Sequence, residues 1–174
     1  MNNPRQEFSK IYDQYINKIY RFVFLKVNSR DTAEDLCSET FLKAWEAFKT
    51  KDLKLIKNYQ AFLYQIARNV VIDYYREKGR TNIISAEFVS IEDPRSNVEE
   101  KSFLDSDLSE VKAVLANLKQ NYQEVIIWRY IDDLSIKEIS KLLGKSEGTA
   151  RVVLHRALKS LKDNLGKRDK FEIG

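Results

Sequence analysis

The sequence contains few of the residues on which enzymes and disulfide-rich proteins depend. Its 174 residues include one cysteine, Cys37, and one histidine, His155. A single cysteine excludes an internal disulfide framework, and its place in an amphipathic stretch predicts a buried thiol rather than a nucleophile. The sequence has no Cys/His metal cluster, phosphate-binding glycine loop or nucleophile elbow. We therefore expect no catalytic residue, no metal site, no cofactor and no enzyme activity.

Glycine, proline and long apolar runs are also scarce. The chain has 5 Gly and 2 Pro, and 43% of its residues are hydrophobic, a composition that favours packed helices over turn-rich sheets. No apolar run approaches the roughly 20 residues of a membrane span, and the polar N-terminus, MNNPRQEFSK, lacks a signal-peptide core. The sequence predicts an all-α, cytoplasmic protein with no membrane span, large enough for two small domains.

Charge is distributed unevenly along the chain. Residues 83–110 carry eight acids and two bases, a net charge of −6, whereas residues 135–170 carry ten bases and four acids, a net charge of +6. This asymmetry is typical of an acidic linker followed by a nucleic-acid-binding module. Residues 81–107 lack periodicity and are predicted to be a flexible acidic linker. It would join a helical domain at 1–80 to a second at 108–165, with a frayed tail at 166–174.

Residues 135–161 predict a helix-turn-helix. Ser135 and Glu138 have the spacing of a capping box. Gly144 stands where the chain turns through the left-handed region, and Ser146 can cap the second helix. The predicted core side of that helix consists of Ala150, Val153, Leu154, Ala157 and Leu161.

The opposite side of the second helix is polar and basic, with small residues near its N-terminus. Such a surface suits a helix that lies in the DNA major groove. We expect contacts with duplex DNA from Ser146, Gly148, Thr149, Arg151, Val152, His155, Arg156 and Lys159. An ordinary helical hairpin with a solvated basic side is the alternative.

Apolar residues at three- and four-residue steps predict helices over 8–27, 31–48 and 61–78, and further helical patterns from Leu108 and from Val125 to Leu134. Asp31 with Glu34 can cap the second of these helices, and Gly79 is expected to end the third. On the third helix, aromatic side chains lie near Asn and Arg, a combination that can stack bases, recognise their edges and bind phosphates. The candidates for single-stranded DNA are Tyr59, Phe62, Asn69, Arg76 and Arg80. The alternative is that these aromatics belong to the core.

Three stretches together resemble a bacterial RNA polymerase sigma factor of the compact extracytoplasmic-function type. DTAEDLCSETFLKAW, at 31–45, resembles the helix that docks on the clamp helices of the largest polymerase subunit. AFLYQIARNVVIDYYREKGR, at 61–80, resembles the segment that opens and recognises the −10 promoter element. Residues 122–161 resemble the module that recognises the −35 element.

The resemblance implies a transcription initiation factor that binds core RNA polymerase and promoter DNA, with an anti-sigma factor as a further partner. It implies that Asp35, Ser38 and Glu39 contact polymerase and that Asn69 lines the pocket for a flipped −10 base. The chain departs from the family pattern at Ser38, where glutamine is common, and at Phe62, which replaces a tryptophan. Val152 and His155 also differ from many relatives, so the family does not imply which −35 sequence is recognised. A stand-alone helix-turn-helix regulator is the alternative, and it would bind paired half-sites tightly without polymerase.

Overall fold

The computed structural model describes residues 3–27, 29–50, 55–81 and 103–172. The regular elements in these ranges are helices, which confirms the all-α prediction for the described part of the chain. The chain divides into two compact units, Met1–Lys101 and Ser102–Gly174. Most of the predicted flexible linker, residues 82–102, lies outside the described residues. Within the described ranges, no helix is long and apolar enough to cross a membrane.

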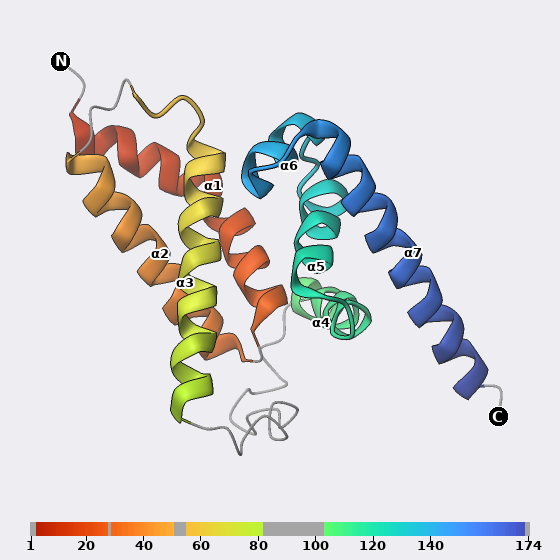
Figure 1. Cartoon of the computed structure of the whole chain (residues 1–174). Helices are drawn as coiled ribbons and strands as arrows, with labels where there is room; N and C mark the ends of the chain where they lie inside the picture. The colour runs from red at the N-terminus through yellow and green to blue at the C-terminus, as the bar shows by residue number, and fades with distance from the viewer. Residues whose placement is uncertain (1–2, 28, 51–54, 82–102, 173–174) are drawn as a thin grey trace. The chain divides into compact units, whose positions relative to one another are not determined.

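Unit 1 contains three long helices that pack against one another (Figure 1). They are α1 (Pro4–Lys26), α2 (Arg30–Thr50) and α3 (Tyr59–Thr81). Helix α1 begins four residues before the predicted start. The Asn3 side chain accepts a hydrogen bond from the Arg5 amide at 3.0 Å, and Pro4 occupies the first helical position, where its fixed φ favours the helix.

Aromatic rings join the helices of unit 1. The rings of Phe22 in α1 and Tyr64 in α3 meet edge to face with their centroids 5.4 Å apart, and both side chains are fully buried. Tyr12 and Phe41 form a similar pair between α1 and α2 at 4.8 Å. Such pairs add roughly 0.5–1.5 kcal/mol each beyond the burial of their surface. Cys37 is also buried, and burial raises the pKa of its thiol to about 11, as expected for a packed rather than a reactive cysteine.

Two residues predicted to mark helix ends in unit 1 do not do so. The cap of α2 is Ser29 and not Asp31, because the Ser29 hydroxyl accepts a hydrogen bond from the Thr32 amide at 3.1 Å. Asp31 therefore lies within the first turn, where its charge favours the helix N-terminus. Gly79 does not end α3, which continues to Thr81. A helical glycine costs only about 1 kcal/mol, so it ends a helix only when its neighbours also favour a turn.

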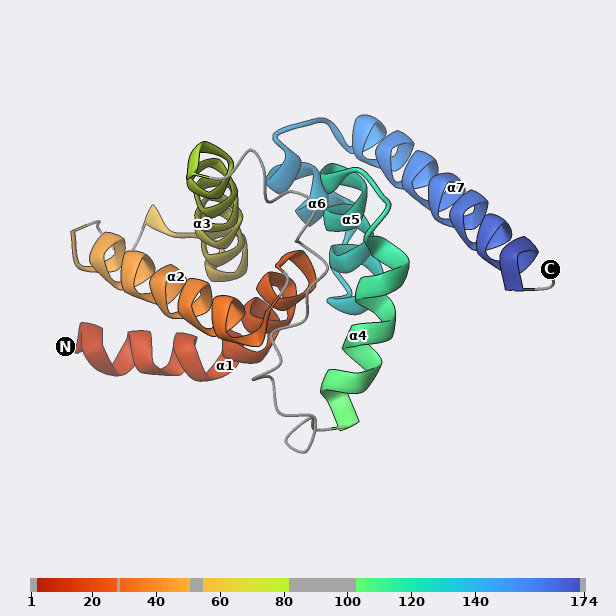
Figure 2. The same cartoon turned by 90° about the horizontal axis from the view of Figure 1, so that it is seen from below.

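Unit 2 contains α4 (Phe103–Leu115), α5 (Gln120–Ile126), a π-helical turn η4 (Ile127–Ile131), α6 (Ile136–Leu143) and α7 (Glu147–Glu172). Helix α7 packs against α4, α5 and α6. In both views α6 lies beside the N-terminal part of α7 (Figures 1 and 2). The core of this unit includes Trp128, which is fully buried.

The local signals of the helix-turn-helix are confirmed. The Ser135 hydroxyl accepts a hydrogen bond from the Glu138 amide at 3.1 Å, and the Ser146 hydroxyl accepts one from the Thr149 amide at 3.1 Å. Gly144 has φ 65° and ψ 31°, the left-handed conformation that glycine adopts without a steric cost. These three residues fix the turn between α6 and α7.

Two helices of unit 2 extend beyond the predicted boundaries. Helix α4 begins at Phe103, so residues 103–107 are helical and not part of the linker. Leu104 and Leu108 extend the apolar spacing of this helix toward its N-terminus, which explains the earlier start. Helix α7 continues through Gly166 to Glu172, where fraying was predicted. The lysines and arginine after Gly166 are good helix formers and offset its cost.

Candidate nucleic-acid interface

The polar side of α7 and its N-terminal cap form the first candidate surface. The eight residues predicted to contact duplex DNA are all exposed: Ser146, Gly148, Thr149, Arg151, Val152, His155, Arg156 and Lys159. The opposite side is buried at Ala150, Leu154 and Ala157. The structure therefore exposes these eight residues on one surface, because helical periodicity separates them from the side of α7 that packs against the rest of unit 2.

The N-terminal end of this surface is preorganised and open. The Ser146 hydroxyl donates a hydrogen bond to the Thr149 hydroxyl at 3.0 Å, in addition to accepting one from the Thr149 amide. A side chain added at Gly148 would meet only the Ser146 hydroxyl, at an ordinary 3.9 Å. Packing within the protein therefore does not require glycine here, and the space above it is available to a ligand.

Charge on this surface is mostly positive. Arg151 forms an ion pair with Glu147 at 3.7 Å, and both side chains are exposed. An exposed pair of this kind contributes only about 0.3–0.5 kcal/mol, so Arg151 can exchange it for a contact with DNA. Lys141 on α6 and Lys145 in the turn are also exposed and add to the positive field near the N-terminus of α7.

A second candidate surface lies on α3. At about 100° per residue, Phe62, Asn69, Asp73 and Arg76 fall within roughly 60° of one another. Asn69, Asp73 and Arg76 are exposed and Phe62 is half-buried. The Arg76 guanidinium lies 3.8 Å from the Asp73 carboxylate. The side chain of Arg80 lies outside the described ones, although its backbone is part of α3. The amide of Asn69 is thus presented between a ring and a cation.

Tyr59 belongs to a different part of unit 1 than the other α3 candidates. Its hydroxyl donates a hydrogen bond to the Glu7 carboxylate at 3.0 Å, and its ring centroid lies 6.3 Å from that of Phe48. Desolvation first, and then the Glu7 hydrogen bond, raise the pKa of Tyr59. The structure therefore gives Tyr59 an internal role, since it ties the start of α3 to α1.

The predicted docking residues lie on the exposed side of α2. Asp35, Ser38 and Glu39 are all exposed, and Glu39 pairs with Lys43 at 3.1 Å. Leu42 lies one turn after Ser38 and is 61% exposed. Sequence reasoning did not single out Leu42, although its position outside the apolar stripe of α2 was a usable signal.

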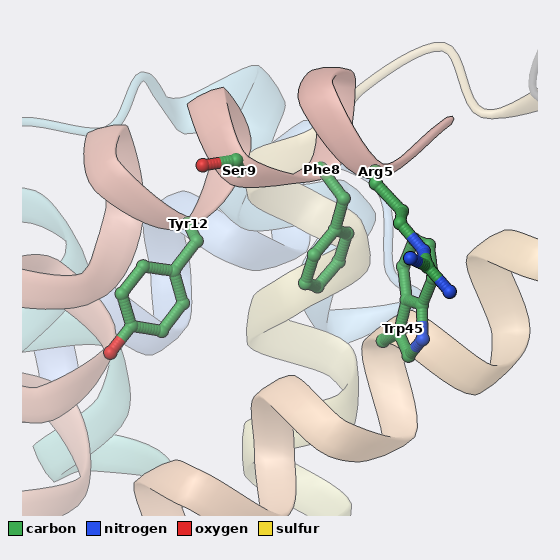
Figure 3. Close-up of a pocket in the computed structure, with 5 residues that line it drawn as sticks. All are labelled: Arg5, Phe8, Ser9, Tyr12 and Trp45. Atoms are coloured by element: carbon green, nitrogen blue, oxygen red, sulfur yellow. The ribbon is translucent and has the colours of Figure 1, made fainter. Parts of the chain in front are cut away.

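An aromatic pocket is lined by residues of α1 and α2. It has a volume of about 490 Å³ and is lined by Arg5, Phe8, Ser9 and Tyr12 of α1 and by Trp45 of α2. Figure 3 shows the Arg5 side chain beside the Trp45 indole, with the rings of Phe8 and Tyr12 further along α1. Trp45 is half-buried. In the described part of the chain, no three His, Cys, Asp or Glu side chains are grouped to hold a metal ion.

Comparisons with known proteins match both units. Residues 11–81 match the family described as Sigma-70 region 2, and residues 108–161 match Sigma-70, region 4. The chain is 33% identical over 159 residues to the ECF RNA polymerase sigma factor SigM of Bacillus subtilis, covering 88% of this chain and 91% of the relative. It is 29% identical over 155 residues to the ECF RNA polymerase sigma factor BldN of Streptomyces coelicolor, covering 88% of this chain but only 58% of that longer protein.

Solved structures show the same fold. The sigma factor RpoE of Bartonella quintana, in complex with the anti-sigma factor NepR, is 25% identical with a TM-score of 0.72, covering 92% of this chain and 98% of that one. CnrH, in complex with the cytosolic domain of CnrY, is 20% identical with a TM-score of 0.70, covering 94% and 90%. Similarity at this identity to CnrH shows the fold alone.

The family relationship decides between the two functions that the sequence left open. A stand-alone regulator would share the helix-turn-helix of unit 2, but it would not carry the region 2 match that spans unit 1. The absence of enzyme activity, predicted from the sequence, agrees with the family. This chain belongs to the extracytoplasmic-function sigma factors, which are non-enzymatic initiation factors that bind core RNA polymerase and direct it to promoter DNA.

Proposed function

We propose that the two units divide promoter recognition, with α7 recognising the −35 duplex and α3 recognising the melted −10 strand. The observation that carries this proposal is the exposed basic side of α7, which lies opposite a buried side and begins at an open, capped helix end. A helix with these properties fits the major groove, where each base pair presents a distinct set of donors and acceptors.

Within the −35 contact, the cations have different roles. Arg151 lies on the polar side of α7, which is the side proposed to face the major groove. There its guanidinium can donate hydrogen bonds to two acceptors of one guanine. Arg156 lies on the flank of that side, where it can contact phosphates and add affinity without sequence preference. His155 lies between them on the groove side.

The −10 contact requires a partner that holds the DNA open. Separating ten base-pair steps costs on the order of 14 kcal/mol at about 1.4 kcal/mol per step. Stacking on a protein ring returns roughly 1–3 kcal/mol per base. Phe62 and Asn69 on α3 therefore cannot open a promoter unaided, and polymerase has to stabilise the melted region. The free protein should consequently be a poor promoter binder.

Polymerase docking is assigned to Asp35, Ser38 and Glu39, which are all exposed on one side of α2. We assign their partner as the clamp helices of the largest polymerase subunit. The complex of RpoE with the anti-sigma factor NepR supports an anti-sigma factor as a second partner of this chain. We propose that this chain acts in the cytoplasm, where core polymerase and promoter DNA are found.

The two units should fold separately, as one domain that ends near Thr81 and another that begins near Phe103. The division of the chain into Met1–Lys101 and Ser102–Gly174 supports this arrangement. Limited proteolysis of the free protein should yield two stable helical fragments with ends near these boundaries. Cleavage that leaves no stable fragment would contradict independent folding.

Co-purification with core polymerase, followed by transcription from a genomic promoter library, tests the proposed function. We expect a holoenzyme that initiates at a small set of promoters with common −35 and −10 elements. Binding of the free chain to paired half-sites, with no change in transcription when it is added to core polymerase, would contradict the proposal.

A further inference from the structure

Val152 is an unusual residue for the surface it occupies. Its side chain is 48% exposed on the polar side of α7. The residues around it on that side are the polar or basic Arg151, His155, Arg156 and Lys159, all exposed. No other large apolar side chain of α7 is exposed before Leu165, which lies more than three turns further along.

Folding of unit 2 does not account for an apolar residue at this position. The core side of α7 is already filled by residues such as Ala150, Leu154 and Ala157, which are buried. Valine also loses side-chain rotamer freedom in a helix, so it is a poorer choice than alanine on an exposed surface. Removing the exposed part of Val152 should therefore leave the stability of the unit nearly unchanged.

The surroundings of Val152 indicate what it contacts. Gly148 lies one turn earlier on the same side. Because it has no side chain and no close neighbour other than Ser146, a ligand can approach the α7 backbone there. The cations on either side favour a polyanion and disfavour an apolar protein surface. In the major groove of DNA, the apolar group within reach of a side chain is the C5-methyl group of thymine.

We propose that Val152 packs against the C5-methyl group of one thymine in the −35 duplex and so determines sequence preference at that position. This inference rests on the proposed recognition of the −35 element by α7. Because thymine alone among the four bases carries this methyl group, a valine contact distinguishes one orientation of an A·T pair from the other pairs without a hydrogen bond.

The test removes the methyl group from the DNA. After the promoter library has identified a −35 element, each thymine of that element is replaced in turn by deoxyuridine, which lacks only the methyl. Closed-complex affinity of the holoenzyme is then measured by competition at one salt concentration. We expect one substitution to weaken binding about fourfold, the effect of exposing one methyl group that was buried. With Val152→Ala the same substitution should have almost no effect, whereas Val152→Ile should keep the fourfold ratio.

Arg156→Ala is the matched control. It should weaken binding to thymine and deoxyuridine duplexes equally and preserve their ratio, because a phosphate contact does not depend on the base. A −35 element without A·T pairs, or wild-type binding that is insensitive to deoxyuridine at every position, would overturn the proposal. A ratio that survives in Val152→Ala would also overturn it.

Further outcomes separate this inference from the proposed function. If deoxyuridine has no effect but Arg151→Ala still alters −35 preference, then α7 recognises the element and only the role of Val152 is wrong. If no substitution on α7 alters −35 preference, the assignment of the element to α7 is itself wrong. A Val152→Ala protein that loses polymerase affinity with unchanged −35 preference would show that Val152 contacts protein instead.

Discussion

Units 1 and 2 achieve their folds by different kinds of contact. In unit 1, long helices are held together by rings from different helices, such as Phe22 with Tyr64 and Phe8 with Trp45, whose centroids lie 5.2 Å apart. In unit 2, the helix-turn-helix depends on hydrogen bonds and dihedral angles within a few residues of one another, as at Ser135 and Gly144. The first kind of contact depends on the tertiary structure, whereas the second can be recognised in the sequence.

The two proposed DNA-binding helices, α7 and α3, expose different kinds of side chain, and each kind suits the form of DNA that the helix is proposed to bind. On α7 the cations outnumber the acids, which suits binding to the backbone of an intact duplex. On α3, Asp73 forms a comparable exposed pair with Arg76 at 3.8 Å, and Phe62 and Asn69 offer a ring and an amide that suit an unstacked base. Unit 2 is thus equipped to contact closed DNA, and unit 1 depends on polymerase before it contacts an open strand. The following variants test this contrast.

The largest effect is expected from reversing two acids on α2. Asp35→Lys combined with Glu39→Lys should weaken core polymerase binding by about a hundredfold or more, because like charges across an interface cost several kcal/mol. Both side chains are exposed, so helical content, melting temperature and duplex binding by unit 2 should hardly change. Polymerase binding can be measured by fluorescence anisotropy.

The control for this double variant reverses two other exposed acids, Asp13 on α1 and Glu110 on α4, and so produces the same change in net charge. The control protein should bind polymerase almost normally. Normal binding by the Asp35→Lys, Glu39→Lys protein would show that α2 docks through other residues.

The next effect concerns the −35 contact of unit 2. Arg151→Ala should reduce discrimination at one −35 position by roughly 5- to 150-fold, equivalent to about 1–3 kcal/mol, if the guanidinium bonds a guanine. Arg156→Ala should instead weaken binding to all sequences. It should also reduce the slope of the logarithm of affinity against the logarithm of salt concentration by about one, because one phosphate contact is lost. Competition between −35 variants at several salt concentrations measures both. Equal loss on every sequence in the Arg151→Ala protein would assign Arg151 to the backbone.

A smaller effect is expected on α3. Asn69→Ala should leave closed-complex binding intact, slow promoter opening about tenfold and change the preference at one −10 position, since an unstacked base loses its amide partner. Permanganate footprinting of the melted region measures opening, and binding to intact duplex measures the earlier step. Asn17→Ala, at an exposed asparagine of α1, is the control. Loss of duplex binding with normal activity on pre-melted templates would contradict the assignment.

Removal of a helix cap should affect the stability of unit 2 alone. Ser135→Ala deletes the hydrogen bond to the Glu138 amide and should cost about 1 kcal/mol. For a domain of this size the loss lowers the melting temperature by roughly 4–8 °C. Calorimetry of the full chain should show this shift in one transition, with the transition of unit 1 unchanged. Ser160→Ala, within α7, should produce no comparable decrease, and equal shifts in both transitions would show that the units unfold together.

The smallest effect is expected at the loop before α6. Asp133 has φ 55°, the left-handed region, which is strained for a residue other than glycine. Asp133→Gly should therefore raise the stability of unit 2 by about 0.5–1 kcal/mol. The same replacement at Asp163, within α7, should lower stability by a few tenths of a kcal/mol, because glycine is a poorer helix former. Chemical denaturation measures both changes, and destabilisation by Asp133→Gly would mean that its carboxylate has an essential partner.

The sequence predictions were wrong where two nearby residues could each cap the same helix, and where a single glycine was taken to end a helix. Ser29 and Asp31 are both good caps, and only the structure shows that Ser29 begins α2. Gly79 and Gly166 both lie within helices, because one glycine is too weak a signal to end a helix without support. The π-helical turn at Ile127–Ile131 and the left-handed Asp133 left no periodic pattern that could predict them.

The sequence by itself determined the helix-turn-helix and the polar side of α7, since caps, turn and helical periodicity involve residues at most a few positions apart. Only the tertiary structure decided the roles of the unit 1 aromatics. Tyr64 is buried against Phe22, and the Tyr59 hydroxyl donates a hydrogen bond to Glu7, 52 positions away in the sequence, while Phe62 stays partly exposed. Tyr64 and Phe62 point to opposite sides of α3, and the contacts of each ring depend on which helix packs against its side.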